Sequence, residues 1–303
     1  MSRSREVQRK QRSALRSKAV VDSSSLASAS PGQAVESEET RLHQPACLGE
    51  SVQASHLQVK KKVQALTGLT IIGSEAGCGK TAAMAGLARA LRDQGVNLRA
   101  IKPLSIGPGD KLDRELSFIS MVTGTPRNYG AVSVVDRDMG DVYWSEALSL
   151  ALSGGQFTMV ETCGGSVTPI CFETASPSVR WRDSRDLALE LGFPCLVVAR
   201  HNQDAIEKLI LTHSYLSAAG LQVSGLLTVE TVAGEGNVLE SRLTRSQLEL
   251  LLASRINAPY LGAIKFSPSI SVTRVNQGNL VKVLESGVDL LAFRRALNLP
   301  LSL

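Results

Sequence analysis

The sequence is poor in aromatic residues and histidine and contains no long apolar run. Only 4% of the 303 residues are aromatic, and the four histidines show no spacing typical of metal ligands. No apolar stretch reaches the roughly 18 residues that a membrane-spanning helix needs. The five cysteines form no Cys-x-x-Cys pair, which favours reduced thiols over a disulfide framework. These absences argue against a zinc module, a membrane-embedded protein and a disulfide-stabilised secreted domain.

The positive charge is concentrated at the start of the chain. The formal net charge is +5, and the first 20 residues carry seven basic side chains and one acidic side chain. The rest of the chain is therefore close to neutral. A near-neutral body offers no electrostatic reason to expect nucleic-acid binding, and the chain has no long apolar run, so we expect neither nucleic acid nor membrane as a partner.

Residues 1–62 form a basic, Ser-rich segment with few aromatic or β-branched residues. Such a composition buries too little apolar surface to offset the entropy of ordering, so we predict a disordered extension. Because the first 20 residues are rich in Arg and Ser, an organellar transit peptide is an alternative, and a misassigned start site is another. We expect a cytoplasmic protein, with organellar targeting left open, and a single folded domain over residues 63–303.

From Gly68 onward, short apolar segments alternate with amphipathic ones. The predicted strands are 69–72, 98–101, 157–160, 194–199, 224–229 and 260–264. The predicted helices are 81–92, 112–122, 145–152, 183–191, 205–219 and 243–253, with a terminal helical region at 280–297. This alternation indicates an α/β fold, doubly wound, with a mostly parallel sheet and helices on both faces.

A glycine-rich loop joins the first predicted strand to the first predicted helix. It reads Gly73-Ser-Glu-Ala-Gly-Cys-Gly-Lys-Thr81, and in this context the pattern predicts a phosphate-binding loop for ATP, or a close relative, with Mg²⁺. The Lys80 ammonium would neutralise phosphate charge, and the Thr81 hydroxyl would ligate Mg²⁺. The predicted nucleotide-binding residues of the loop are Ala76, Gly77, Cys78, Gly79, Lys80 and Thr81.

Charged residues follow two further strands at the edge where an open parallel sheet binds its ligands. Lys102 ends the second strand and would meet a transferring phosphoryl group or an anionic substrate. Glu161 ends the third strand, before Gly164, and would hold Mg²⁺ directly or through water. Asp113, or alternatively Asp110, lies after Lys102 and would complete the metal shell.

Taken together, these segments resemble the dethiobiotin synthetase family. The resemblance covers roughly residues 68–290, and the family's own loop, Gly-Thr-Asp-Thr-x-Val-Gly-Lys-Thr, has its first glycine in the same early position. The matching segments are Gly73-Ser-Glu-Ala-Gly-Cys-Gly-Lys-Thr81, Ile101-Lys-Pro-Leu104, Val160-Glu-Thr-Cys-Gly-Gly165 with Thr168-Pro-Ile170, Pro194-Cys-Leu-Val-Val198 and Ala258-Pro-Tyr-Leu-Gly262.

The resemblance implies an ATP-dependent ring closure in biotin synthesis. In that reaction 7,8-diaminononanoate takes up CO₂ as a carbamate, whose oxygen attacks the γ-phosphoryl group, and the second amine then displaces phosphate to close the ureido ring. Lys80 and Lys102 would be the catalytic residues, stabilising phosphoryl and carbamate oxygens. Thr81, Asp113 and Glu161 would hold Mg²⁺. The resemblance also implies a homodimer.

Several positions depart from the family pattern. Ala76 replaces a loop threonine, and the substrate-binding hydroxyl expected after Lys102-Pro103 falls on Ile106 or shifts to Ser105. Val229 stands where the family reads adenine, with Glu230 beside it. We therefore predict Ser105 and Ile106 at the substrate, and Gly164, Val229 and Glu230 at the nucleotide.

These departures leave other functions open. One is a synthetase-like nucleotide-binding regulatory module that has lost catalysis. Another is an amide ligase of the cobyrinate type, although the sequence shows no downstream glutaminase domain.

Overall fold

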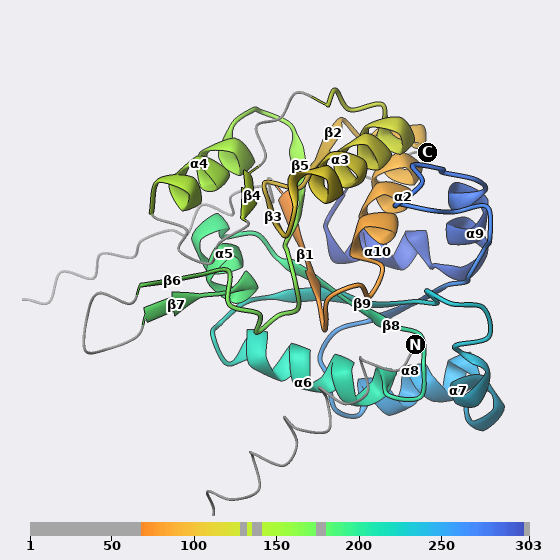
Figure 1. Cartoon of the computed structure of the whole chain (residues 1–303). Helices are drawn as coiled ribbons and strands as arrows, with labels where there is room; N and C mark the ends of the chain where they lie inside the picture. Colours follow the sequence, from red (N-terminus) through yellow and green to blue (C-terminus); the bar gives the residue numbers. More distant parts are fainter. Residues whose placement is uncertain (1–67, 128–131, 135–140, 174–179, 300–303) are drawn as a thin grey trace, which may run out of the picture. The chain divides into compact units, whose positions relative to one another are not determined.

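The computed structural model of the chain describes residues 68–127, 132–134, 141–173 and 180–299 (Figure 1). The extension predicted for residues 1–62 lies outside these residues. Within the described part, no helix combines the length and apolar character that crossing a bilayer requires.

A six-stranded parallel sheet forms the centre of the domain. Its strand order is β10-β9-β8-β1-β5-β2, and every neighbouring pair runs parallel. The strands are β1 (Gly68–Gly73), β2 (Leu98–Ile101), β5 (Phe157–Glu161), β8 (Cys195–Arg200), β9 (Val223–Val229) and β10 (Tyr260–Ile264). All six agree with the strands expected from the sequence pattern, and the doubly wound α/β class is confirmed.

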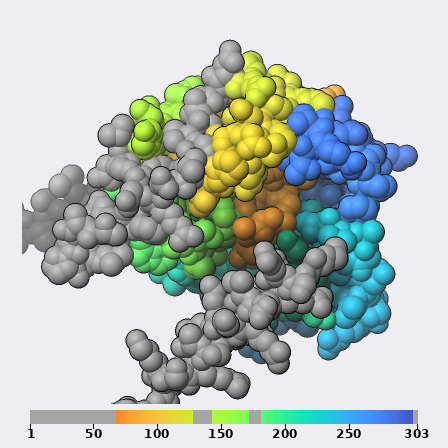
Figure 2. Space-filling view, viewed as in Figure 1, coloured from red at the N-terminus to blue at the C-terminus, as the bar shows by residue number. Residues whose placement is uncertain are grey.

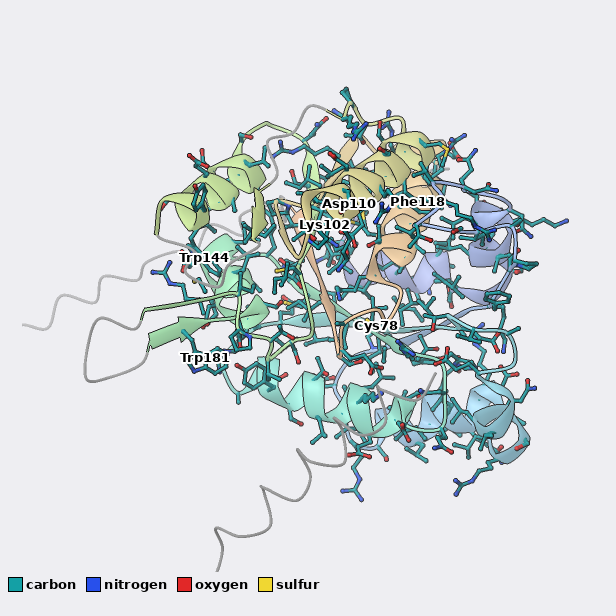
Figure 3. The ribbon with its side chains drawn as sticks, viewed as in Figure 1. Cys78, Lys102, Asp110, Phe118, Trp144 and Trp181 are labelled. Atoms are coloured by element: carbon teal, nitrogen blue, oxygen red, sulfur yellow. The ribbon has the colours of Figure 1, made fainter. Side chains whose placement is uncertain are left out.

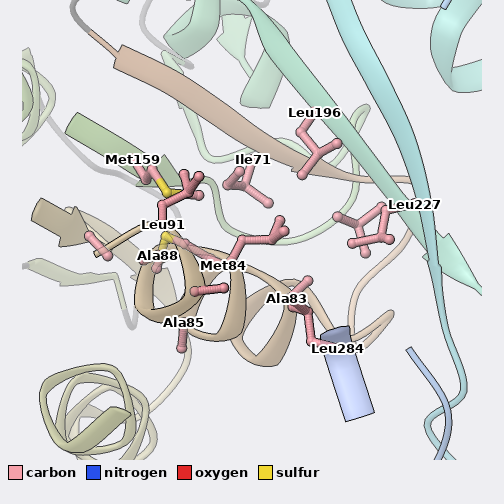
Figure 4. Close-up of a cluster of buried hydrophobic side chains, with 14 of the residues drawn as sticks. Ile71, Ala83, Met84, Ala85, Ala88, Leu91, Met159, Leu196, Leu227 and Leu284 are labelled. Atoms are coloured by element: carbon pink, nitrogen blue, oxygen red, sulfur yellow. The ribbon is translucent and has the colours of Figure 1, made fainter. Parts of the chain in front are cut away.

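Alternation of side chains along the strands creates two apolar faces. In β1, Ile71 packs with one core cluster and Ile72 with another, because successive residues of a strand point to opposite faces. Helices α2 (Lys80–Asp93), α3 (Gly109–Thr123), α9 (Leu280–Gly287) and α10 (Leu290–Ala296) supply residues to the first cluster. Figure 4 shows Met84, Ala88 and Leu91 of α2 directed at the strands of this face.

The opposite face is covered by different helices. These are α4 (Asp141–Leu152), α5 (Ser184–Leu191), α6 (Ala205–Ser217) and α8 (Arg245–Ala253). The short helix α7 (Asn237–Arg242) follows β9. Because helices cover both faces of the sheet in the described part of the chain, a ligand is expected at the strand ends and their loops.

Some elements do not follow from the sequence pattern. Two short pairs lie outside the main sheet, β3 (Leu104–Ile106) with β4 (Val132–Val134) and β6 (Cys171–Glu173) with β7 (Arg180–Arg182). The terminal helical region is divided between α9 and α10, where Val288 forms an isolated bridge with Gly262. A side chain on Gly262 would collide with the Gly287 carbonyl, so glycine permits this close approach.

The strand register aligns the ends that carry the predicted site. Glu161 of β5 lies opposite Ile71 of β1, two residues before that strand ends. On the other side of β1, Gly73 lies opposite Val198, and Arg200 of β8 lies opposite Val229 of β9. The carboxyl ends of neighbouring strands therefore meet around the loop that follows β1.

Candidate nucleotide-binding site

The loop between β1 and α2 has the backbone of an anion cradle. Gly77 and Gly79 adopt φ of 72° and 92°, a left-handed conformation that favours glycine. Gly79 caps the N-terminus of α2, and no side-chain hydrogen bond caps the helix. The first N–H groups of α2 are therefore free to bind phosphate oxygens at the positive end of the helix dipole.

Gly73 has a steric role at the start of the loop. A Cβ at this position would lie 2.7 Å from Cys78 Sγ and 2.7 Å from Lys80 Nζ. The early glycine of the sequence pattern therefore lets these two side chains pass over the strand end. Cys78 itself is fully buried, and its thiol donates to the Val198 carbonyl at 3.3 Å. It supports the loop from the side of the sheet.

Lys80 connects the loop to the segment after β5. Its Nζ donates to the Gly164 carbonyl at 2.5 Å and lies 3.4 Å from the Glu75 carbonyl. The two segments approach closely because Gly165 has no side chain: a Cβ there would lie 3.0 Å from the Glu75 Cα. The ammonium therefore stands at the mouth of the loop, where phosphate oxygens would replace carbonyl contacts.

A buried cluster of charges surrounds Glu161. Its Oε1 accepts from the Thr81 hydroxyl at 2.8 Å and from Lys102 Nζ at 2.7 Å. Lys102 Nζ lies 2.9 Å from Glu115 Oε2 as well. Burial alone would lower the pKa of Lys102, but the Glu161 and Glu115 carboxylates outweigh it and raise that pKa above its ordinary value. Lys102 is a fixed cation.

The donor atoms of this cluster suit a magnesium ion. Glu161 is 1% exposed, and its Oε2 is buried with no hydrogen-bond partner among the described residues. Mg²⁺ prefers one or two carboxylates with hydroxyl, water and phosphate oxygens. Thr81 and Glu161 provide such oxygens, and in the described ranges no group of three or more His, Cys, Asp or Glu forms a complete protein cage.

The acidic residue that α3 brings to the cluster is Glu115. Asp113 is instead 67% exposed and pairs with Arg127 at 3.1 Å, and Asp110 pairs with Arg114 at 2.8 Å. Positions two residues apart on a helix point in nearly opposite directions, so Asp113 and Glu115 cannot serve the same site. The structure thus corrects the predicted placement of Asp113, and of Asp110, at the metal.

A cavity of about 560 Å³ opens over the loop at the carboxyl edge of the sheet. In Figure 2 the surface of β1 and α2, in orange, lies between the yellow segment around α3 and the blue C-terminal segments. Every predicted site residue lines this cavity except Cys78 and Asp113. The lining predicted residues are Ala76, Gly77, Gly79, Lys80, Thr81, Lys102, Ser105, Ile106, Glu161, Gly164, Val229 and Glu230.

The predicted substrate residues line the same cavity as Lys102, which is labelled in Figure 3. Ser105 is 2% exposed, and its hydroxyl donates to Glu115 Oε2 at 3.3 Å. Ile106 is half-buried and presents an apolar side chain to the cavity. Ser105 therefore orients a carboxylate of the cluster, while Ile106 leaves the cavity apolar at this point.

Val229 and Glu230 lie on the other side of the loop. A Cβ on Gly79 would come within 2.6 Å of the Val229 side chain, so Val229 packs against the loop. The Glu230 carboxylate accepts from the backbone N–H groups of Gly236 at 3.0 Å and Phe266 at 3.2 Å. Glu230 therefore ties together the two loops that form this wall of the cavity.

Two residues of the site were not predicted from the sequence. Glu115 had a signal: it lies three residues after Leu112 and four before Ile119, both buried, so it shares their helical face. Glu75 had none, because only the fold brings it to Lys208, 2.8 Å away, and to Arg200, 3.7 Å away. These ion pairs anchor the phosphate loop to α6 and β8.

The cavity also contains a thiol that is unsuited to nucleophilic chemistry. Burial raises the pKa of Cys163 to about 11, although Lys102 and Lys80 each lower it. The group is therefore protonated at neutral pH. The charged groups of the site are fixed cations and carboxylates around a phosphate loop.

The parallel sheet, the glycine loop and its lysine define a P-loop protein of the nucleotide-binding α/β class. Comparison with curated proteins identifies the relatives. The chain is 30% identical over 176 residues to the ATP-dependent dethiobiotin synthetase of Mycobacterium avium, covering 54% of this chain and 74% of the relative. The enzyme of Anaeromyxobacter dehalogenans is 30% identical over 181 residues, covering 55% and 78%. The chain belongs to the dethiobiotin synthetase family.

The chain was also compared with family models and with solved structures. No family model matches the chain. Among solved structures, the MinC:MinD cell division protein complex of Aquifex aeolicus aligns with a TM-score of 0.47 and 13% identity, covering 78% of this chain and 97% of that chain. The cell division ATPase MinD of Pyrococcus furiosus aligns with a TM-score of 0.46 and 16% identity, covering 77% and 97%.

Proposed function

We propose that the protein is a dethiobiotin synthase that uses ATP and Mg²⁺ to carboxylate 7,8-diaminononanoate with CO₂ and close the ureido ring. The observation that carries this proposal is the buried cluster of Thr81, Lys102, Glu115 and Glu161 beside the phosphate loop. A general triphosphate site needs Lys80 and Thr81. A second buried lysine beside them suits a reaction in which another anion, the carbamate, meets the γ-phosphoryl group.

The roles of the residues follow from their contacts. Lys80 neutralises the phosphate oxygens, and Lys102 stabilises the carbamate oxygen that attacks the γ-phosphoryl group. Thr81 and Glu161 would hold Mg²⁺, which would screen the charge of the phosphates when bound. Because both lysines are already fixed by their partners, little reorganisation accompanies the reaction, and catalysis comes from positioning and electrostatic stabilisation. The protonated thiol of Cys163 takes no covalent part.

The direct test is an assay for the product. Purified protein with ATP, Mg²⁺, bicarbonate and diaminononanoate should release phosphate and form dethiobiotin, detected by mass spectrometry. Expression should also restore growth of a biotin auxotroph that lacks this step. Lys102→Met should lose turnover while retaining ATP affinity, because Lys102 lies outside the phosphate loop. Failure of a stably folded protein in both the assay and the growth test would reject the proposal.

A nucleotide-binding regulatory module is the second candidate. The observation that favours it is the position of Val229, which packs against Gly79 and whose side chain has no hydrogen-bonding group for a base. Such a module would bind Mg²⁺-nucleotide, lose that binding in Lys80→Ala, and form no product. Calorimetric nucleotide binding without dethiobiotin formation would select this function.

A further inference from the structure

Arg200 contacts the phosphate loop and is not among the residues predicted for the site. It is the last residue of β8, and its side chain is 34% exposed. A Cβ on Gly77 would lie 3.4 Å from Arg200 Nη2, so the guanidinium packs against the backbone of the loop. Gly77 lines the large cavity, whereas Arg200 does not. Arg200 therefore supports the loop without facing the ligand.

Carboxylates from two different loops flank this guanidinium. Glu75 belongs to the phosphate loop, and its Oε1 lies 3.7 Å from Arg200 Nε. Glu235 belongs to the loop between β9 and α7, and its Oε1 lies 3.6 Å from Arg200 Nη1. Both distances exceed the roughly 3.2 Å limit of an N–H···O hydrogen bond, so the attraction acts through charge. One planar cation thus links two loops that are distant in the sequence.

Each carboxylate has a further partner that fixes it in place. Lys208 of α6 donates to Glu75 Oε1 at 2.8 Å. Glu235 Oε2 accepts from the backbone N–H and from the hydroxyl of Thr231, both at 2.9 Å. Burial would raise the pKa of Glu235, but the Thr231 bonds and the Arg200 charge outweigh it and lower that pKa below its ordinary value. The Glu235 carboxylate is therefore ionised at neutral pH beside Arg200.

Both linked loops contribute to the wall of the large cavity. Gly77 lines it from the phosphate loop, and Thr231, which Glu235 holds, lines it from the loop after β9. Phosphates bind at the first of these loops. The resemblance to the synthetase family places the base beside Val229, at the start of the second. The spacing of the two loops therefore decides whether one nucleotide can contact both.

The bonding capacity of the Arg200 guanidinium is not fully used. Its Nε is buried and has no hydrogen-bond partner among the described residues. A buried donor without an acceptor is costly, so such groups are few and call for an explanation. A small movement of Glu75 toward Arg200 would give this donor an acceptor. Arg200 thus retains bonding capacity for a state in which the two loops lie closer together.

We propose that Arg200 is a positioning residue that holds the phosphate loop and the loop after β9 at the spacing that a nucleoside triphosphate needs. It acts through Glu75 and Glu235 and does not touch the nucleotide. The inference goes beyond the proposed function, because it concerns nucleotide affinity and applies to a synthase and to a regulatory module alike. A protein that forms no dethiobiotin would reject the proposed function and leave this inference standing.

Two ligands distinguish the two loops. A non-hydrolysable ATP analogue extends over both, whereas inorganic tripolyphosphate has no ribose or base to reach the loop after β9. Calorimetry with Mg²⁺ present measures Kd for each ligand in the wild type and in Arg200→Met, with Arg255→Met, at an exposed position after α8, as the control. Arg200→Met should raise Kd for the analogue roughly tenfold, the lower end of the cost of a lost supporting contact. Kd for tripolyphosphate should change by much less, and the control should match the wild type.

Three further variants test the route through Glu235. Arg200→Lys should give an intermediate Kd for the analogue, because an ammonium cannot face two carboxylates as a planar guanidinium does. Glu235→Gln should also raise this Kd. The double variant should raise it by less than the product of the two single increases, since both changes break the same link. The thermal midpoint of each variant without ligand shows whether it folds.

The opposing results are distinct. Equal weakening of both ligands would confine Arg200 to general support of the fold or of the phosphate loop, and unchanged Kd values would leave it no role at the site. Independent, multiplicative effects of Arg200→Met and Glu235→Gln would show that Arg200 does not act through Glu235. Each of these results would overturn the inference. If Arg200→Met does not fold, Arg200→Lys and Glu235→Gln provide the same comparison of the two ligands.

Discussion

At the scale of single residues, Glu161 and Lys102 show that site residues can be predicted from the charged residues at the ends of apolar strands. Both are predicted because charged residues directly follow apolar strands, and parallel strands end at a common edge. The structure brings them to 2.7 Å. The choice of Asp113 is wrong for a helical reason: on α3 the face toward the core selects Glu115, and residue type alone does not show that face. The ion pairs of Glu75 could be identified only from the tertiary structure.

A pair of substitutions on α3 tests this assignment. Glu115→Gln removes one of the two carboxylates that hold Lys102, so turnover should fall by about tenfold to a hundredfold, the usual cost of losing a supporting contact. The matched change Asp113→Asn alters an exposed ion pair and should leave turnover unchanged. Phosphate release measured at saturating ATP checks both. Loss in Asp113→Asn with full activity in Glu115→Gln would reverse the assignment.

At the scale of elements, apolar periodicity predicts all six strands of the main sheet and most of the helices. The short pairs β3–β4 and β6–β7 contain too few residues for a periodic signal, so they do not stand out in the sequence. The division between α9 and α10 depends on a contact with Gly262, which is distant in the chain. The local sequence pattern thus predicts elements that have their own apolar face. Helix boundaries that depend on contacts with residues distant in the chain can be identified only from the tertiary structure.

The connection between α5 and α6 yields a prediction about pH. Asp183 caps α5, accepting from the N–H groups of Arg185 and Asp186, and it also accepts from the Tyr215 hydroxyl of α6. Burial raises the pKa of Asp183 above its ordinary value of 3.8, and the Tyr215 bond lowers it in part. Tyr215→Phe should therefore raise this folded-state pKa further.

When the pKa of a carboxyl group is higher in the folded protein than in the unfolded protein, the free energy of unfolding falls as the pH rises above the unfolded-state pKa. Tyr215→Phe should thus lose about 1–3 kcal/mol of unfolding free energy near neutral pH, the cost of a lost partner for a buried charge. The loss should shrink as pH falls toward 3.8. Urea denaturation at several pH values, with Tyr143→Phe at an exposed site as the control, measures it. A loss that is independent of pH would show that the hydroxyl acts by packing alone.

At the scale of the whole molecule, one rule locates the site from the order of strands and loops: ligands of an open parallel sheet bind at the carboxyl ends of its strands. Twelve of the fourteen predicted site residues line a single cavity there. The rule could not predict the contacts of the wall around Glu230, because that wall is formed by the loops after β9 and β10, which meet through hydrogen bonds from Gly236 and Phe266 to Glu230.

The N-terminal extension also gives a prediction at this scale. We expect a protein lacking residues 1–62 to keep the thermal midpoint and the nucleotide affinity of the full chain, because the composition of this segment cannot support a packed core. Differential scanning calorimetry of the two proteins tests this. A clear fall in the midpoint of the shortened protein would show that the segment contributes to the fold. Localisation of a fluorescent fusion, with and without the segment, would decide between a cytoplasmic and an organellar protein.

The most direct test of the proposed chemistry follows an oxygen atom. If a carbamate oxygen held by Lys102 attacks the γ-phosphoryl group, bicarbonate labelled with oxygen-18 should transfer label into the phosphate released with each dethiobiotin formed. Mass spectrometry of the phosphate at short reaction times measures this transfer. Labelled phosphate in step with dethiobiotin is the expected result. Release of unlabelled phosphate, as from attack by water, would contradict it.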